Sequence, residues 1–300
     1  MSSIRFGITF SHTHLNFLKI PINDALDLAL EMGFSHLRLG SYWQEVEKNK
    51  GVYNFSKLED LLNRCEKTEQ KVIMNVGVKS PRWPEFYWPR YLKEKNFNNS
   101  ETRKRILLFV EKLVRTLKKY SCITHWQVEN EPLDLSGPEN LAIPIDFLIE
   151  EVKLVRKLDN RPIILTLWAN DLESRQLFLD VSSISNVIGL DLYYKQFMKS
   201  GKGKSFYEGP RTSDDYLREI VKTSSKEVII TELQAEPWEK DEKGYLSKNP
   251  ESISPKLLES NLKKASSLGV REIILWGFEY WYYQKSQGDN RYLKVIKEYL

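Results

Sequence analysis

The feature that most constrains the fold of this chain is an alternation of short apolar segments and amphipathic segments that runs from end to end. The apolar segments predict strands over residues 4–10, 36–39, 71–78, 123–128, 162–167, 187–192, 227–231 and 272–276. Apolar residues at helical spacing predict helices over 21–32, 56–69, 100–119 (with Ser100 as N-cap), 145–158, 172–181, 213–223, 254–268 and 291–300. Strands that alternate with helices favour a parallel sheet, because each helix must return the chain over the sheet before the next strand. Eight such units predict an α/β protein with a closed (β/α)8 barrel, also called a TIM barrel.

The connections between these elements favour the barrel over a doubly wound open sheet. Loops from a helix to the next strand are short, whereas several loops from a strand to the next helix are long, over 79–99, 129–144, 193–212 and 233–253. In a barrel these long loops gather at the C-terminal face, where active sites lie. The first strand is followed by Phe10-Ser11-His12-Thr13-His14, not by a glycine-rich phosphate loop. A barrel needs about 250 residues or more, so the 300 residues predict a single domain over 1–300.

Composition argues against two kinds of partner. The net charge of +4 is mild and the basic residues are spread over helix faces, which does not favour nucleic acid. No apolar run approaches the ~20 residues of a membrane span, and residues 1–7 lack the basic head and long apolar core of a signal peptide. We therefore expect a cytoplasmic protein without a membrane partner, whose oligomeric state the sequence does not indicate. Cys65 and Cys122 lack CxxC spacing and are expected to be buried free thiols.

Two glutamates stand where predicted strands reach the C-terminal face. The fourth strand continues as Trp126-Gln127-Val128-Glu129-Asn130-Glu131-Pro132, and the seventh as Ile229-Ile230-Thr231-Glu232-Leu233. One glutamate at such a place is a weak indication, because glutamates often only solvate loops. Strands four and seven, however, lie on opposite sides of an eight-stranded ring, so Glu131 and Glu232 can face each other across its mouth. Glycosidic bond cleavage needs such a pair, one carboxyl to protonate the leaving oxygen and one to attack the sugar or activate water.

The Asn130-Glu131-Pro132 tripeptide after an apolar strand, with a second glutamate ending strand seven, resembles clan A retaining glycoside hydrolases. This clan of (β/α)8 enzymes includes cellulases, β-mannanases and β-galactosidases, and the similarity covers nearly the whole predicted barrel. The stretches 41–47 and 51–55 resemble the tryptophan-rich second loop of clan members, as does Pro81-Arg82-Trp83-Pro84-Glu85 after strand three. The resemblance implies a retaining β-glycoside hydrolase that cleaves O-glycosidic bonds of a β-linked oligo- or polysaccharide without a cofactor.

The resemblance also implies roles for individual residues. Glu131 would be the acid/base and Glu232 the nucleophile, and Asn130 would hydrogen-bond the sugar 2-hydroxyl. Arg38, at the end of strand two, would orient the nucleophile, and Tyr193, after strand six, would hydrogen-bond it. Trp276, at the end of strand eight, would form the floor of the sugar-binding subsite.

The chemistry of these residue types agrees with those roles. A general acid working near neutral pH needs a raised pKa, which a nearby carboxylate supplies. The nucleophile must stay ionised, and a guanidinium such as Arg38 and a phenol such as Tyr193 are suitable partners. Once the nucleophile has become a glycosyl ester its charge is gone, so the acid can then act as a base. Retention predicts carboxyl groups about 5–5.5 Å apart, and inversion about 6.5–9.5 Å.

Other residues at the predicted loop-rich face are candidates for sugar contacts. Trp43, Trp168 and Trp238 follow predicted strands, and their rings suit the C–H faces of pyranose sugars, although packing within the loops is the alternative. His12 and His14 are either sugar contacts or structural hydrogen-bonding groups. A His-x-His pair after strand one also begins zinc hydrolase barrels, but the chain has only 4 histidines in all, so we do not expect a metal.

Three features leave their roles open. Asp191 stands two residues before Tyr193, where the clan often has His or Asn. Glu129 is expected to pair with a cation in the barrel or at its rim, or else to contact sugar hydroxyls or tune Glu131. The segment 195–211, with Lys199, Lys202 and Lys204, is expected to be a mobile, solvated lid, with recognition of an acidic sugar as the alternative.

Two other function classes stay open at this point. One is a catalytically silent carbohydrate-binding barrel, which would not need all five of Glu131, Glu232, Asn130, Arg38 and Tyr193. The other is transglycosylation or phosphorolysis at the same site. The sequence leaves the sugar configuration and the choice between exo and endo cleavage undecided, with a preference for short oligosaccharides.

Overall fold

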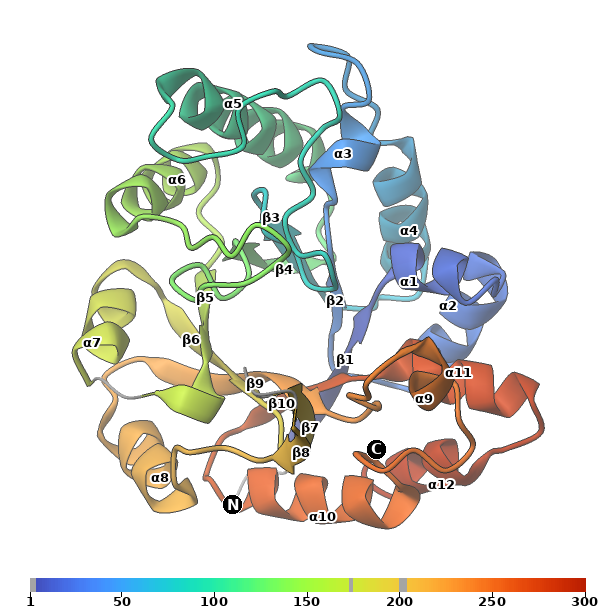
Figure 1. The fold of residues 1–300 in the computed structure, drawn as a ribbon. Coiled ribbons are helices and arrows are strands. Elements are labelled where there is room, and N and C mark those ends of the chain that lie inside the picture. The colour runs from blue at the N-terminus through green and yellow to red at the C-terminus, as the bar shows by residue number, and fades with distance from the viewer. Residues whose placement is uncertain (1–3, 173–174, 200–203) are drawn as a thin grey trace. The chain divides into compact units, whose positions relative to one another are not determined.

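The computed structural model describes residues 4–172, 175–199 and 204–300, and its main sheet is a closed barrel (Figure 1). The strand order around the barrel is β1-β10-β9-β6-β5-β4-β3-β2. These strands are β1 Arg5–Phe10, β2 Leu37–Leu39, β3 Val72–Val76, β4 Ile123–Val128, β5 Ile163–Trp168, β6 Val187–Leu192, β9 Glu227–Gln234 and β10 Glu272–Trp276. Neighbouring strands run parallel, as in the registers Met74 with Trp126 and Gly7 with Ile274. The predicted (β/α)8 barrel is confirmed.

Helices lie between the strands, and those that the sequence predicts are present with shifts of a few residues at their ends. They are α2 Ile22–Glu31, α4 Ser56–Lys67, α5 Ser100–Leu117, α6 Ile145–Leu158, α7 Arg175–Ile184, α8 Asp214–Thr223, α10 Pro255–Ser266 and α12 Arg291–Lys297. The prediction for α7 began at Leu172, and residues 173–174 lie outside the described part of the chain. Each of these helices turns an apolar face to the interior, as α5 does with Ile106, Phe109, Val110, Leu113 and Val114.

The chain divides into two compact units. Unit 1 comprises Met1–Ser35, Trp168–Arg175 and Gly189–Leu300, and unit 2 comprises His36–Leu167 and Gln176–Ile188. In unit 2, α5 and α6 lie side by side and pack on β3 and β4 (Figure 1). In unit 1, α10 packs on β9 and α12, and α11 (Phe278–Ser286) packs on β1. A single domain over 1–300 stays a prediction.

Several short elements were not predicted by the sequence. They are α1 His12–Phe17, α3 Trp43–Val46, the 3-10 helix η1 Ala169–Asp171, α9 Glu242–Tyr245 and α11. The reason is clearest for α11, where buried residues do not form one stripe and the periodic signal of an amphipathic helix is therefore missing. The N-cap of α1 is Ser11, whose hydroxyl accepts a hydrogen bond from the backbone N–H of His14 at 3.2 Å.

Two further predictions were wrong in detail. The N-cap of α5 is Asn99, not Ser100, because the Asn99 side chain accepts from the Thr102 N–H at 3.0 Å. β9 continues to Gln234, so Glu232 lies inside the strand and not at its end. The lysine-rich segment contains two antiparallel strands, β7 Gln196–Lys199 and β8 Ser205–Glu208, and Lys202 lies outside the described residues. The mobile lid stays a prediction. Cys65 and Cys122 are buried free thiols, as predicted.

Candidate active site

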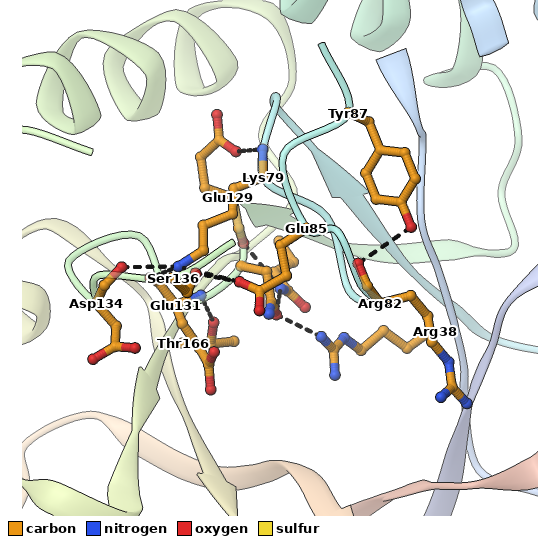
Figure 2. A network of polar contacts seen from close by, with 12 residues as sticks. Arg38, Lys79, Arg82, Glu85, Tyr87, Glu129, Glu131, Asp134, Ser136 and Thr166 are labelled. Atoms are coloured by element: carbon orange, nitrogen blue, oxygen red, sulfur yellow. Dashed lines mark hydrogen bonds and ion pairs between the residues drawn. The ribbon is translucent and has the colours of Figure 1, made fainter. Parts of the chain in front are cut away.

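In unit 2, the end of β4 carries three buried polar residues in succession, Glu129, Asn130 and Glu131. Glu129 (φ 59°) and Glu131 (φ 42°) both have left-handed backbone, which residues with side chains adopt rarely and which is enriched at functional sites. The Glu131 N–H is held by the hydroxyl of Thr166 on β5 at 2.6 Å (Figure 2). Surrounding contacts therefore have to maintain the conformation of the predicted acid/base.

The buried guanidinium of Arg38 on β2 donates a hydrogen bond to Asn130 Oδ1 at 2.7 Å. Gln127 Nε2 donates to the same oxygen at 3.1 Å, so the Asn130 amide is oriented from two sides. The side-chain partner that the structure assigns to Arg38 in unit 2 is thus Asn130. The predicted contact of Arg38 with Glu232, which belongs to unit 1, stays a prediction.

Glu129 lies against the turn that follows β3. Its carboxylate accepts hydrogen bonds from the backbone N–H groups of Val78 at 2.9 Å and Lys79 at 2.5 Å. Gly77 (φ +120°) permits this approach, because a Cβ there would lie 2.1 Å from the carboxyl carbon of Glu129. The expectation of a cation as main partner was wrong, since backbone N–H groups hold this carboxylate and the Lys79 charge is a smaller influence. Burial nevertheless raises the pKa of Glu129 to about 7.

A second buried carboxyl, Glu151 on α6, is the neighbour of Glu129. Within the described residues, neither Glu151 oxygen has an N–H or O–H donor in hydrogen-bond range. Burial and then the charge of Glu129 raise the pKa of Glu151 well above its usual value. A proton on Glu151 would give the two carboxyls a hydrogen bond, and we therefore infer that the pair holds one proton at neutral pH.

This pair predicts that the native state loses stability as pH rises. Glu129 has a folded pKa of about 7 against 4.5 as its ordinary value, so its contribution is complete below pH 4.5 and is lost as pH rises through about 7. Glu151→Gln keeps a hydrogen-bond donor beside Glu129 but removes the carboxyl group that binds the shared proton. We expect the loss of unfolding free energy between pH 5 and 8 to be smaller in this variant by about 1–2 kcal/mol.

Urea denaturation at several pH values measures this difference. Glu219→Gln is the control, because Glu219 is an exposed glutamate on another helix, α8. A Glu151→Gln protein with the same pH dependence as the wild type would exclude a shared proton.

In unit 1, the buried carboxylate of Glu232 on β9 accepts a hydrogen bond from the Tyr193 hydroxyl at 2.5 Å. Asn170 holds Tyr193 from both sides of its backbone: Oδ1 accepts from Tyr193 N–H at 2.8 Å and Nδ2 donates to Tyr193 C=O at 2.6 Å. Sequence reasoning missed Asn170, whose only signal was its place just after a strand. The predicted partnership of Tyr193 and Glu232 is present in the structure.

Asp191 has a structural partner next to Glu232. Its carboxylate accepts a hydrogen bond from the Thr231 hydroxyl at 2.6 Å, which links β6 to β9 one residue before Glu232. Asp191, whose role the sequence left open, therefore connects β6 to β9 through this hydrogen bond.

Aromatic rings surround the Tyr193 phenol. Trp168 stacks on it with ring centroids 5.2 Å apart, and Trp238 meets it edge-on at 5.1 Å. Trp238 is 41% exposed, so one surface of this cluster is open to a ligand. Trp276, at the end of β10, is buried to 8% exposure.

The remaining predicted site residues divide into two groups. His14 Nε2 lies 2.8 Å from the Tyr245 hydroxyl, which donates to Glu236 at 2.9 Å, and His12 is buried in the same helix α1. Trp43, by contrast, has no exposed ring face: it stacks on Phe109 and its Nε1 donates to Glu47 at 2.7 Å. Burial thus argues against Trp43 as a sugar platform, and we leave it out of the proposed site.

The fold is similar to that of solved carbohydrate-active proteins. Xylanase 10B of Thermotoga petrophila RKU-1, solved with xylobiose, has TM-score 0.61 and 15% identity, with 92% of this chain and 82% of that chain covered. A GH5_18 protein of Streptomyces cattleya, solved with GlcNAc, has TM-score 0.65 and 13% identity. The match covers 91% of this chain and 70% of that chain. An endo-β-1,4-xylanase of glycoside hydrolase family 10 from Gloeophyllum trabeum has TM-score 0.61 and 13% identity. The match covers 91% of this chain and 83% of that chain.

This chain has their (β/α)8 fold. The resemblance inferred from Asn130-Glu131-Pro132 is thereby confirmed at the level of fold. No family model and no curated protein matches the sequence. Among the helices of the described residues, none combines the length and apolar character needed to cross a bilayer.

Proposed function

We propose that this protein is a retaining β-glycoside hydrolase with Glu232 as nucleophile and Glu131 as acid/base. The observation that carries the proposal is the 2.5 Å hydrogen bond from Tyr193 to the buried Glu232 carboxylate. A hydroxyl donor at this place orients one carboxylate oxygen, and a hydrogen bond to a carboxylate favours its ionised form, which the nucleophile needs. The buried Asn130-Glu131 pair at the end of β4, oriented through Arg38 and Thr166, supports the second half of the proposal.

The proposed reaction proceeds in two displacements. Glu232 attacks the anomeric carbon while Glu131 gives its proton to the leaving oxygen, which forms a glycosyl ester and releases the aglycone. Glu131 then takes a proton from water as the water attacks the anomeric carbon, and Glu232 leaves as a carboxylate. Because Asn130 Oδ1 already accepts two hydrogen bonds, its amide NH2 group is the side left to donate to a sugar hydroxyl.

The proposed substrate is a β-linked carbohydrate. Trp238, with its exposed ring beside Tyr193, is the best candidate for a sugar platform, supported by Trp168 and Trp276. His14 and His12 are further candidates for contacts with hydroxyl groups. The solved structures of similar fold contain xylobiose and GlcNAc, so aryl β-glycosides of xylo, gluco and N-acetylglucosamine configuration are the first substrates to assay.

Covalent labelling tests this proposal directly. A dinitrophenyl 2-deoxy-2-fluoro-β-glycoside of the accepted sugar is expected to inactivate the enzyme and to leave one sugar ester on Glu232, identified by mass spectrometry of the peptide. The fluorine slows hydrolysis of the ester, so a labelled species accumulates. A silent binding barrel would bind the sugar without being labelled, and labelling at any other residue would contradict the assignment.

Product analysis separates hydrolysis from the other reactions of the same site. We expect water to be the main acceptor for the glycosyl ester. A dominant alkyl glycoside in the presence of alcohol would indicate a transglycosylase, and a sugar phosphate in the presence of phosphate would indicate phosphorolysis.

A further inference from the structure

Lys79 is a fully buried lysine in unit 2 that the proposed chemistry does not use. Its ammonium donates hydrogen bonds to the backbone carbonyls of Glu131 at 2.7 Å and Asp134 at 3.0 Å (Figure 2). The carboxylate of Glu85 lies 3.5 Å from the same nitrogen and compensates its charge. A buried ammonium is costly unless it is paired and hydrogen-bonded, and here three oxygens meet that requirement.

Glu129 makes the reciprocal connection. The ammonium of Lys79, just after β3, reaches carbonyls that follow β4, while the carboxylate of Glu129, just after β4, accepts from the N–H groups of Val78 and Lys79. Lys79 and Glu129 together, which we call the clasp, thus join the ends of β3 and β4 on both sides of Glu131. Figure 2 shows the contact of the Glu129 carboxylate with the Lys79 backbone and, separately, the contacts of the Lys79 ammonium with the segment after β4.

The backbone at Glu131, which lies between these two connections, has a conformation that neighbouring contacts must maintain. Glu131 has a φ of 42°, in a region that is unfavourable for a residue with a side chain and persists only where neighbours enforce it. Thr166 accepts from the Glu131 N–H, and Lys79 donates to the Glu131 C=O, so both peptide groups that flank this φ/ψ pair are held. Only the second of these contacts depends on a charged side chain.

We infer that Lys79, with Glu129, is a positioning residue that holds the Glu131 carboxyl where it can protonate the leaving group. The inference rests on the proposed function and deepens it, because it concerns the step of acid catalysis and not the attack by Glu232. A misplaced acid should slow only those substrates whose leaving group needs a proton.

The test compares two leaving groups on the sugar that the wild-type enzyme cleaves. In Lys79→Met, which keeps an unbranched side chain one atom shorter and removes the charge, kcat/KM should fall about 100-fold for the phenyl glycoside. For the 2,4-dinitrophenyl glycoside, whose leaving group departs without protonation, the fall should be less than about 5-fold. Glu129→Gln is the second variant and should show the same selectivity with a smaller loss.

Lys118→Met is the matched control, because the exposed Lys118 also donates to a backbone carbonyl, that of Leu158 at 3.2 Å, outside the candidate site. Lys118→Met should leave kcat/KM unchanged for both the phenyl and the 2,4-dinitrophenyl glycoside. Equal losses on both glycosides in folded Lys79→Met, or loss of the native circular dichroism spectrum in both clasp variants, would overturn the inference. A wild-type protein inactive on every glycoside would instead refute the proposed function, which keeps the two failures distinct.

Discussion

Glu232→Gly is expected to lower kcat by about four orders of magnitude or more, because no other group can form the glycosyl ester. The space left by the side chain admits a small anion to the anomeric carbon. Azide or formate should therefore restore part of the turnover of an activated aryl glycoside, and the azide product should have inverted configuration. Rate assays measure the loss of kcat and its partial restoration, and nuclear magnetic resonance of the sugar azide gives the configuration of the product.

The inverted product is the decisive part of this experiment. Loss of activity alone could follow from unfolding, whereas an anion that attacks from the side of the missing carboxylate identifies Glu232 as the nucleophile. Glu227→Gly is the matched control, because Glu227 is an exposed glutamate at the opposite end of β9. Wild-type turnover in Glu232→Gly would refute the assignment outright.

Glu131→Ala should have a different signature. Without the acid, kcat/KM for a phenyl glycoside should fall by about 10²–10⁴-fold, while formation of the glycosyl ester from a dinitrophenyl glycoside should be little affected. Hydrolysis of the ester then becomes slow, since the base is missing too. Azide should accelerate that second step and give a product of retained configuration, opposite to the result for Glu232→Gly.

Burst kinetics with the dinitrophenyl substrate and the configuration of the azide product measure this prediction. Glu139→Ala serves as control, because Glu139 is an exposed glutamate in the same loop after β4. Equal loss on both leaving groups, or an inverted azide product, would show that Glu131 is not the acid/base.

The positions of the two carboxylates and the tyrosine could be predicted because they depend on local sequence. Apolar periodicity identifies the strands, and a parallel barrel brings the C-terminal ends of its strands to one face. Tyr193 and Glu232 follow or end predicted strands, and their hydrogen bond has the partners that the sequence suggested. The same reasoning misjudged Trp43, because periodicity does not tell whether a residue after a strand turns outward or packs under a helix such as α5.

The supporting contacts could not be predicted, because they join residues far apart in the chain. Lys79 and Glu131 are 52 residues apart, and Asn170 and Tyr193 are 23 apart. Whether such pairs meet depends on strand register and on turn conformation at positions such as Gly77, which no periodic signal encodes. Glu129 shows the consequence: its residue type suggested a cation as partner, and the turn after β3 offers backbone N–H groups instead.

Hydrophobic periodicity and residue chemistry are local properties, and in this protein they were enough to predict the barrel, the segment after β4 that contains Glu131 and the strand that contains Glu232. Only the tertiary structure decided which groups hold those residues: Lys79 and Thr166 around Glu131, and Tyr193 with Asn170 beside Glu232. The physical reason is that a buried polar group must find a hydrogen-bond partner wherever the packed chain provides one, and packing is a property of the whole fold.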